Sequence, residues 1–147
     1  MIDREARTAT AELLRHFMAG LITNDELQDR LPRRSGDPAV REVGKASWYL
    51  YSDLREYRLV GKDKASPAVR AVVARWIAFL HTDREYEFPV VSTLSRLGYT
   101  VLNLATVGIA GAIWRRRHRA EIENWPFARP SDLADALKSP RLLAGAS

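Results

Sequence analysis

The segment LGYTVLNLATVGIAGAIWRRRHR, residues 97–119, decides between two kinds of fold. No charged residue occurs in the 18 positions from Leu97 to Trp114, and four arginines and a histidine follow directly. As a helix these positions would span about 27 Å, close to the roughly 30 Å of hydrocarbon in a bilayer. Tyr99 and Trp114 stand near the two ends, where membrane helices carry aromatic residues. These features are typical of a helix that enters a membrane.

The same segment also has the composition of a helix at the centre of a bundle. Asn103 near its middle and three glycines weaken the case for insertion. A helix that is apolar on all sides suits a bundle centre, so we predict a central core helix over 92–119 and keep a membrane-associated or spanning helix as the alternative. The arginines at its end are candidates for contact with phosphate or lipid headgroups: Arg115, Arg116, Arg117 and Arg119.

Outward from this segment, apolar residues recur at helical spacing in 3–20, 38–54 and 67–80, and a shorter helix is expected over 24–31. Helix starts are marked by capping signals at Thr23 with Glu26, Asp37-Pro38, Ser66-Pro67 and Ser131. The expected apolar faces include Leu21 after the first helix, and Trp48 and Leu54 in the third.

The sequence therefore predicts an all-α fold of about five or six helices in a single domain, 1–147. Its parts are a helical hairpin over 3–31, two amphipathic helices over 38–80, the central helix over 92–119, and a C-terminal tail over 120–147 with a short helix to about Lys138. A short strand over 86–91 is an alternative near Phe88-Pro89, because proline disfavours helix in the residue before it.

Composition narrows the class of protein. The net charge of the 147 residues is +5, and residues 91–147 supply most of it, with 8 Lys and Arg against 4 Asp and Glu. This clustering argues against nucleic-acid binding, because nucleic-acid-binding proteins usually spread basic residues over a whole face. Cysteine is absent, which excludes disulfides and thiolate chemistry. The N-terminal residues lack an apolar stretch of signal-peptide length, so we expect a cytoplasmic protein.

The stretch HTDREYEFP, residues 81–89, supplies the main candidate site. Alternation places Asp83, Glu85 and Glu87 on one side of an extended segment. Three carboxylates with His81 would suit a divalent cation or acid–base chemistry, but ion pairing and interface contacts are the favoured interpretation. We call residues 81–87 the acidic loop. Its predicted partner-binding residues are Asp83, Glu85, Tyr86 and Glu87.

Two aromatic groups allow a structural and a functional interpretation. Trp125-Pro126-Phe127 is expected to be buried and to fix the C-terminal tail, rather than to serve as an exposed recognition motif. A polar and aromatic group near the end of helix 38–54 is expected to pack in the core, with a binding surface as the alternative: Tyr49, Tyr51, Asp53 and Glu56.

Motifs of catalysis and cofactor binding do not occur. The three histidines are far apart in the sequence, and phosphate-binding loops, dinucleotide-binding glycine patterns and nucleophile-elbow motifs are missing. We therefore expect no catalytic residue, metal or cofactor.

Three stretches of the sequence carry a resemblance: WYLYSDLREYRLVGKDKAS, ARWIAFLHTDREYEFP, and NWPF before SDLADAL. Together they resemble a group of short uncharacterised bacterial proteins that share an Asp-x-Glu-Tyr-Glu-aromatic-Pro motif and a C-terminal Trp-Pro-Phe. Phe88 stands where that group has tryptophan, and Arg84 where it has an apolar residue. The resemblance implies a family and no chemistry.

These observations predict a non-enzymatic module that binds another protein, of bacterial accessory, regulatory or immunity type. One alternative is a membrane-associated protein that uses the apolar segment and its arginines. Another is a small enzyme or divalent-metal protein that uses the acids of 81–87.

Overall fold

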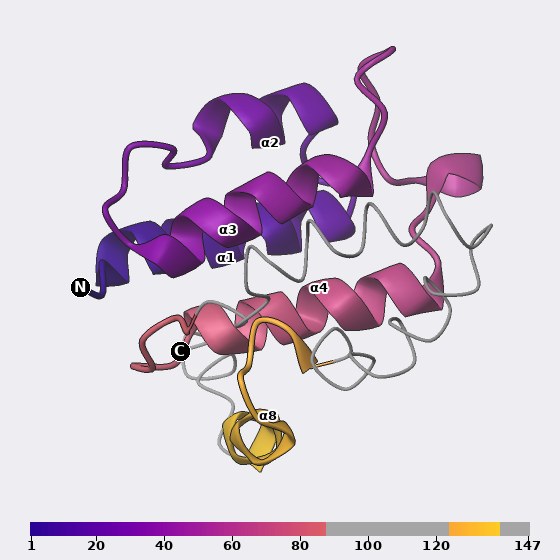
Figure 1. The fold of residues 1–147 in the computed structure, drawn as a ribbon. Coiled ribbons are helices and arrows are strands. Elements are labelled where there is room, and N and C mark those ends of the chain that lie inside the picture. Colours follow the sequence, from indigo (N-terminus) through magenta and orange to yellow (C-terminus); the bar gives the residue numbers. More distant parts are fainter. Residues whose placement is uncertain (88–123, 139–147) are drawn as a thin grey trace, which may run out of the picture.

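The structure, a computed structural model, describes residues 1–87 and 124–138 (Figure 1). These residues form five α-helices and no strand, so the predicted all-α fold is confirmed. The helices are α1 (Arg4–Met18), α2 (Asn24–Arg30), α3 (Pro38–Ser47), α4 (Pro67–Leu80) and α8 (Pro130–Lys138), with two 3-10 turns, η1 (Trp48–Leu50) and η2 (Gly61–Asp63).

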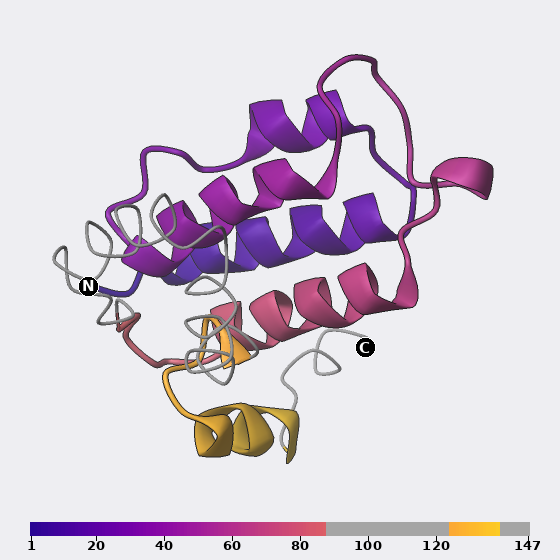
Figure 2. The ribbon, with the colours of Figure 1, turned by 45° about the vertical axis from the view of Figure 1, so that its right-hand side comes forward.

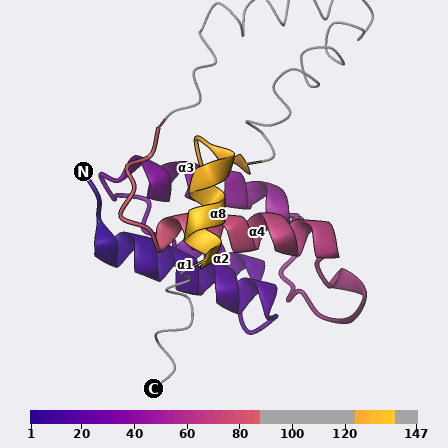
Figure 3. The same cartoon turned by 90° about the horizontal axis from the view of Figure 1, so that it is seen from below.

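Helix α1 lies at the centre of the described part. It packs against α2 and α3 on one side and against α4 on the other, as Figures 1 and 2 show. Helix α8 lies on the far side of α4 and crosses it, which is clearest from below (Figure 3). The buried face of α1 supplies Leu14 and Phe17, and α3 and α4 add Val43 and Val73 to the same core.

The predicted capping signals position three of the helices. The Thr23 hydroxyl accepts from the amide of Glu26, whose carboxylate accepts from the amide of Thr23 at 2.8 Å, forming the expected capping box. At the starts of α3 and α4 the side chain alone caps the helix: Asp37 accepts from the amide of Ala39 and Ser66 from the amide of Val69, and each is followed by proline. Ser131 does not cap α8, because the helix already begins at the preceding proline.

The third helix is shorter than predicted. It ends at Ser47, whose hydroxyl donates to the carbonyl of Gly44, and the 3-10 turn η1 replaces further α-helix. Trp48 is therefore 61% exposed and Leu54 is 91% exposed, so their assignment to the inner face is wrong. Leu21 is exposed for a related reason, because the positive φ of the preceding glycine ends α1 and turns the chain away.

The predicted strand over 86–91 and the apolar segment 97–114 lie partly or wholly outside the described residues. Tyr86 and Glu87 belong to no strand, and the rest of the proposed 86–91 strand lies outside the described residues. The apolar segment 97–114 also lies outside them. Among the helices in 1–87 and 124–138, none has the length and apolar character needed to cross a bilayer.

Alanine substitutions at two glycines should change stability in opposite directions. Gly20 has φ 71°, and a Cβ there would meet Cγ1 of Val60 at 2.6 Å. We expect Gly20→Ala to lower the free energy of unfolding by about 1–2 kcal/mol or more. A Cβ at Gly44, inside α3, meets nothing within 4 Å, and Gly44→Ala should raise the same quantity by about 0.5–1 kcal/mol. Urea unfolding followed by circular dichroism measures both, and a shift of equal sign would contradict this account.

Candidate functional site

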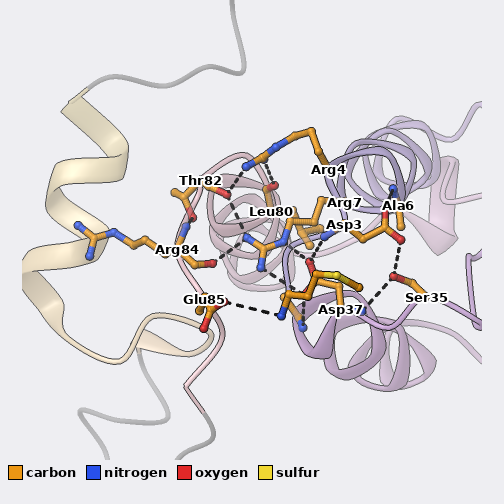
Figure 4. A network of polar contacts seen from close by, with 12 residues as sticks. Asp3, Arg4, Ala6, Arg7, Ser35, Asp37, Leu80, Thr82, Arg84 and Glu85 are labelled. Carbon is orange, nitrogen blue, oxygen red and sulfur yellow. Dashed lines mark hydrogen bonds and ion pairs between the residues drawn. The ribbon is translucent and has the colours of Figure 1, made fainter.

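The acidic loop is held to α1 through its backbone. The guanidinium of Arg7 donates to the carbonyls of Thr82 at 3.0 Å and Arg84 at 2.9 Å (Figure 4). Arg4, one turn earlier on the same helix, donates to the carbonyls of Leu80 at 3.2 Å and Thr82 at 3.0 Å. Two arginines of α1 therefore hold the backbone of this part of the loop, in addition to the contacts that its own side chains make.

Arg7 also forms a buried ion pair with Asp37, the residue that caps α3. Both side chains are 0% exposed, and Nε of Arg7 lies 2.6 Å from Oδ2 of Asp37. The carboxylate accepts further hydrogen bonds from the amides of Asp3 at 3.0 Å and Ala39 at 2.9 Å. The guanidinium carbon lies 5.5 Å from the centre of the Phe79 ring. One ion pair thus joins α1, the start of α3 and the end of α4.

The environment of Asp37 keeps its carboxylate ionised. Burial alone would raise the pKa of Asp37, but the hydrogen bonds from Arg7, Asp3 and Ala39, with the charge of Arg7, lower it further than burial raises it. The pKa of Asp37 therefore lies below its ordinary value of 3.8. A carboxylate that is buried, ionised and fully bonded suits a structural role rather than acid–base catalysis.

The carboxylates of the acidic loop do not converge on one point. Asp83 forms an ion pair with Arg4, and Glu85 lies 3.7 Å from the α-amino group of Met1, while Glu87 is exposed. In residues 1–87 and 124–138 no group of three His, Cys, Asp or Glu side chains is placed to share a metal ion. In the described residues, the alternating acids Asp83, Glu85 and Glu87 therefore lie at the surface or in ion pairs and do not form a shared cation site.

Tyr86 faces inward and joins the loop to the C-terminal tail. Its hydroxyl accepts a hydrogen bond from Nε1 of Trp125 at 2.9 Å, and its ring meets Phe79 edge-on at 6.2 Å. Burial raises the pKa of Tyr86, although the hydrogen bond from Trp125 acts in the opposite direction. Phe127 is 3% exposed and lies 5.1 Å from Phe79, so the predicted burial of the Trp-Pro-Phe motif is confirmed for Pro126 and Phe127, while Trp125 is only partly buried. Partner contact by Tyr86 stays a prediction.

Sequence reasoning missed a groove between α2 and α3. Both helices pack on α1, and they leave a hollow of about 330 Å³ that opens to solvent. Its apolar lining comes from α3 and from the segments that follow α2 and α3: Leu31, Pro32, Val40, Trp48 and Tyr51. Three cationic side chains also line it, together with Gln28 and Gly44: Arg33, Arg41 and Lys45. We call this hollow the α2–α3 groove.

The end of α3 explains the shape of this groove. Tyr51 is half-buried, with its ring 5.8 Å from Phe17 in an edge-on contact and its hydroxyl 3.4 Å from Oε1 of Gln28. Burial raises the pKa of Tyr51, consistent with a packed phenol. The neighbouring Trp48 and Tyr49 instead point outward, and both are exposed. The aromatic rim could not be predicted from the sequence, because the predicted continuation of α3 places Trp48 in the core.

The predicted arginine cluster at 115–119 lies outside the described residues. Comparisons with protein-family models, curated proteins and solved structures find no match for this chain. The resemblance to short bacterial proteins therefore stays a prediction, and function has to be argued from the geometry.

Proposed function

We propose that this protein is a non-enzymatic module that binds another protein through the α2–α3 groove. The observation that carries this proposal is the exposed Trp48 at the rim of an apolar hollow, beside Arg33 and Arg41. Tryptophan, tyrosine and arginine dominate the binding energy of protein interfaces, above all where they surround a pocket that a partner can fill. A bacterial accessory, regulatory or immunity role in the cytoplasm fits this proposal, as does the absence of cysteine.

The groove has walls that need little ordering before a partner binds. The capping box fixes the start of α2, Asp37 fixes the start of α3, and the Phe17 contact fixes Tyr51. A surface that already has its bound shape loses less conformational entropy on association. The acidic loop is a second predicted contact, and the clamp of Arg4 and Arg7 on its backbone gives it the same advantage.

Two groove variants and one matched control test the proposal. Gly44→Leu fills the groove from its lining, where a Cβ meets nothing within 4 Å, and Trp48→Ser removes the exposed indole. Leu137→Ser changes a residue that is 57% exposed on α8, away from the groove. Immobilised wild-type protein and the three variants are incubated with lysate of the source organism, and retained proteins are quantified by mass spectrometry.

We expect a discrete set of proteins on the wild type and on the control, reduced about tenfold or more on both groove variants, as the loss of a hot-spot residue predicts. Circular dichroism first verifies that all four baits are folded. Retention of the same proteins by all four baits would show that the groove is not the contact surface.

A further inference from the structure

We infer that the α2–α3 groove takes an acidic segment of the partner that presents one bulky apolar side chain. This inference rests on the proposed function and specifies the chemistry of the occupant. The apolar hollow would hold the side chain, and the cations around it would meet carboxylates on either side.

The charge around the groove is positive. Its lining contains Arg33, Arg41 and Lys45 and no carboxylate. Nζ of Lys45 forms an ion pair with Oε1 of Glu42 at 2.7 Å. One guanidinium nitrogen of Arg33 donates to the carbonyl of Gln28 at 2.9 Å. Arg41 is exposed and forms no ion pair with any residue in the described part of the chain. At least one full cationic charge is therefore available to a ligand at the rim.

The sequence around the groove extends this positive surface. From residue 28 to residue 45 the chain carries four arginines and one lysine against the carboxylates of Asp29 and Glu42 and a third, that of Asp37. That carboxylate is fully buried and is paired with Arg7, so it does not offset the surface charge. Complementary charge steers association and selects partners, and here it selects an anionic one.

The size and openness of the hollow favour a peptide segment. About 330 Å³ is at the lower limit of ligand pockets, and it suits one large side chain. Val40, 2% exposed, forms part of the buried lining, while Trp48 lines the rim and is still 61% exposed. A partner chain that continues past its anchored side chain would cover the exposed part of this indole, which a ligand confined to the hollow would leave in water.

Fluorescein-labelled peptides of one length test this inference. The acidic probe is Glu-Asp-Ser-Trp-Glu-Asp, with one bulky apolar side chain. The neutral probe replaces its acids by glutamine and asparagine, and the basic probe replaces them by lysine. Fluorescence anisotropy with the full chain gives each Kd at low and at physiological salt. We expect the acidic probe to bind about tenfold or more tightly than the neutral probe, with an affinity that falls as salt rises, and the basic probe to bind more weakly still.

Charge reversal at the rim identifies the site. Arg41→Glu should weaken binding of the acidic probe about tenfold, while Arg70→Glu, which reverses an exposed arginine on α4, should leave the Kd within about twofold. Equal affinity for the acidic and neutral probes, no binding of any probe, or equal loss in both variants would overturn the inference. The proposed function would still stand in each of these cases if the groove variants lose the proteins that the wild type retains, because that experiment does not depend on charge.

Discussion

Arg7→Met is expected to lower the free energy of unfolding by about 3–5 kcal/mol, because it removes one partner of a buried ion pair. The carboxylate of Asp37 would remain at 0% exposure without its cation. The carbonyl of Arg84 would lose the bond from Arg7, and the carbonyl of Thr82 would keep only the bond from Arg4. Methionine replaces the aliphatic part of the arginine, so the effect would come mainly from lost polar contacts. Urea unfolding at pH 7, followed by circular dichroism, measures it.

Arg4 supplies a matched control, because it lies one turn away and also donates to Thr82. Its side chain is 40% exposed and its carboxylate partner, Asp83, is 61% exposed. Ion pairs of this kind contribute little, so Arg4→Met should cost less than about 1 kcal/mol. Equal losses of unfolding free energy in Arg7→Met and Arg4→Met would mean that the burial of Arg7 does not determine how much it stabilises the fold.

The same pair sets the response to acid. Because the pKa of Asp37 is lower in the folded protein than its ordinary 3.8, its contribution is fully present above that ordinary value and is lost as pH falls through the lower folded pKa. Asp37→Asn should therefore be less stable than wild type at pH 6, and the difference in free energy of unfolding should shrink below about pH 4. A difference that is constant from pH 6 to pH 3 would contradict the assigned direction.

Phe127→Ala should have the second large effect, a loss of about 3–5 kcal/mol in the free energy of unfolding. Phe127 is 3% exposed and packs edge-on against Phe79 of α4. The truncation would leave a cavity at the place where residues 124–138 join the core. Thermal unfolding by calorimetry gives the change in Tm and in enthalpy.

Leu137→Ala is the control for this truncation. It removes an apolar side chain from α8 that is 57% exposed, and surface changes of this kind usually stay within about 0.5 kcal/mol. Similar stability of the two variants would show that Phe127 does not fasten the tail to the helices.

Local signals in the sequence predicted most helix boundaries. Caps such as Thr23 and Asp37 act within three residues, so a single sequence contains the whole signal. The predicted end of α3 was wrong because the apolar periodicity continues through Trp48 to Leu54. In the structure α3 ends at Ser47, whose hydroxyl donates to the carbonyl of Gly44, and apolar periodicity carries no signal for this contact.

The candidate sites depend on residues that meet only in the folded chain. The suggestion that acids of residues 81–87 pair with arginines elsewhere is confirmed for Asp83, but nothing local in the sequence identifies Arg4 as its partner. The α2–α3 groove was missed for the same reason, since it depends on how two helices rest on a third. Tyr86 was predicted as a contact residue, and its bond to Trp125 bridges 39 positions of sequence.

The guanidinium of Arg7 has a consequence for how the chain opens. Its bonds join residues 30, 75 and 77 positions apart, so one side chain closes three long loops at once. Closure entropy grows slowly with loop length, and once these bonds exist, none of the three segments can separate alone without exposing the buried carboxylate. We therefore expect the start of α1, the start of α3 and the acidic loop to form one cooperative unit, whose amides exchange with solvent together.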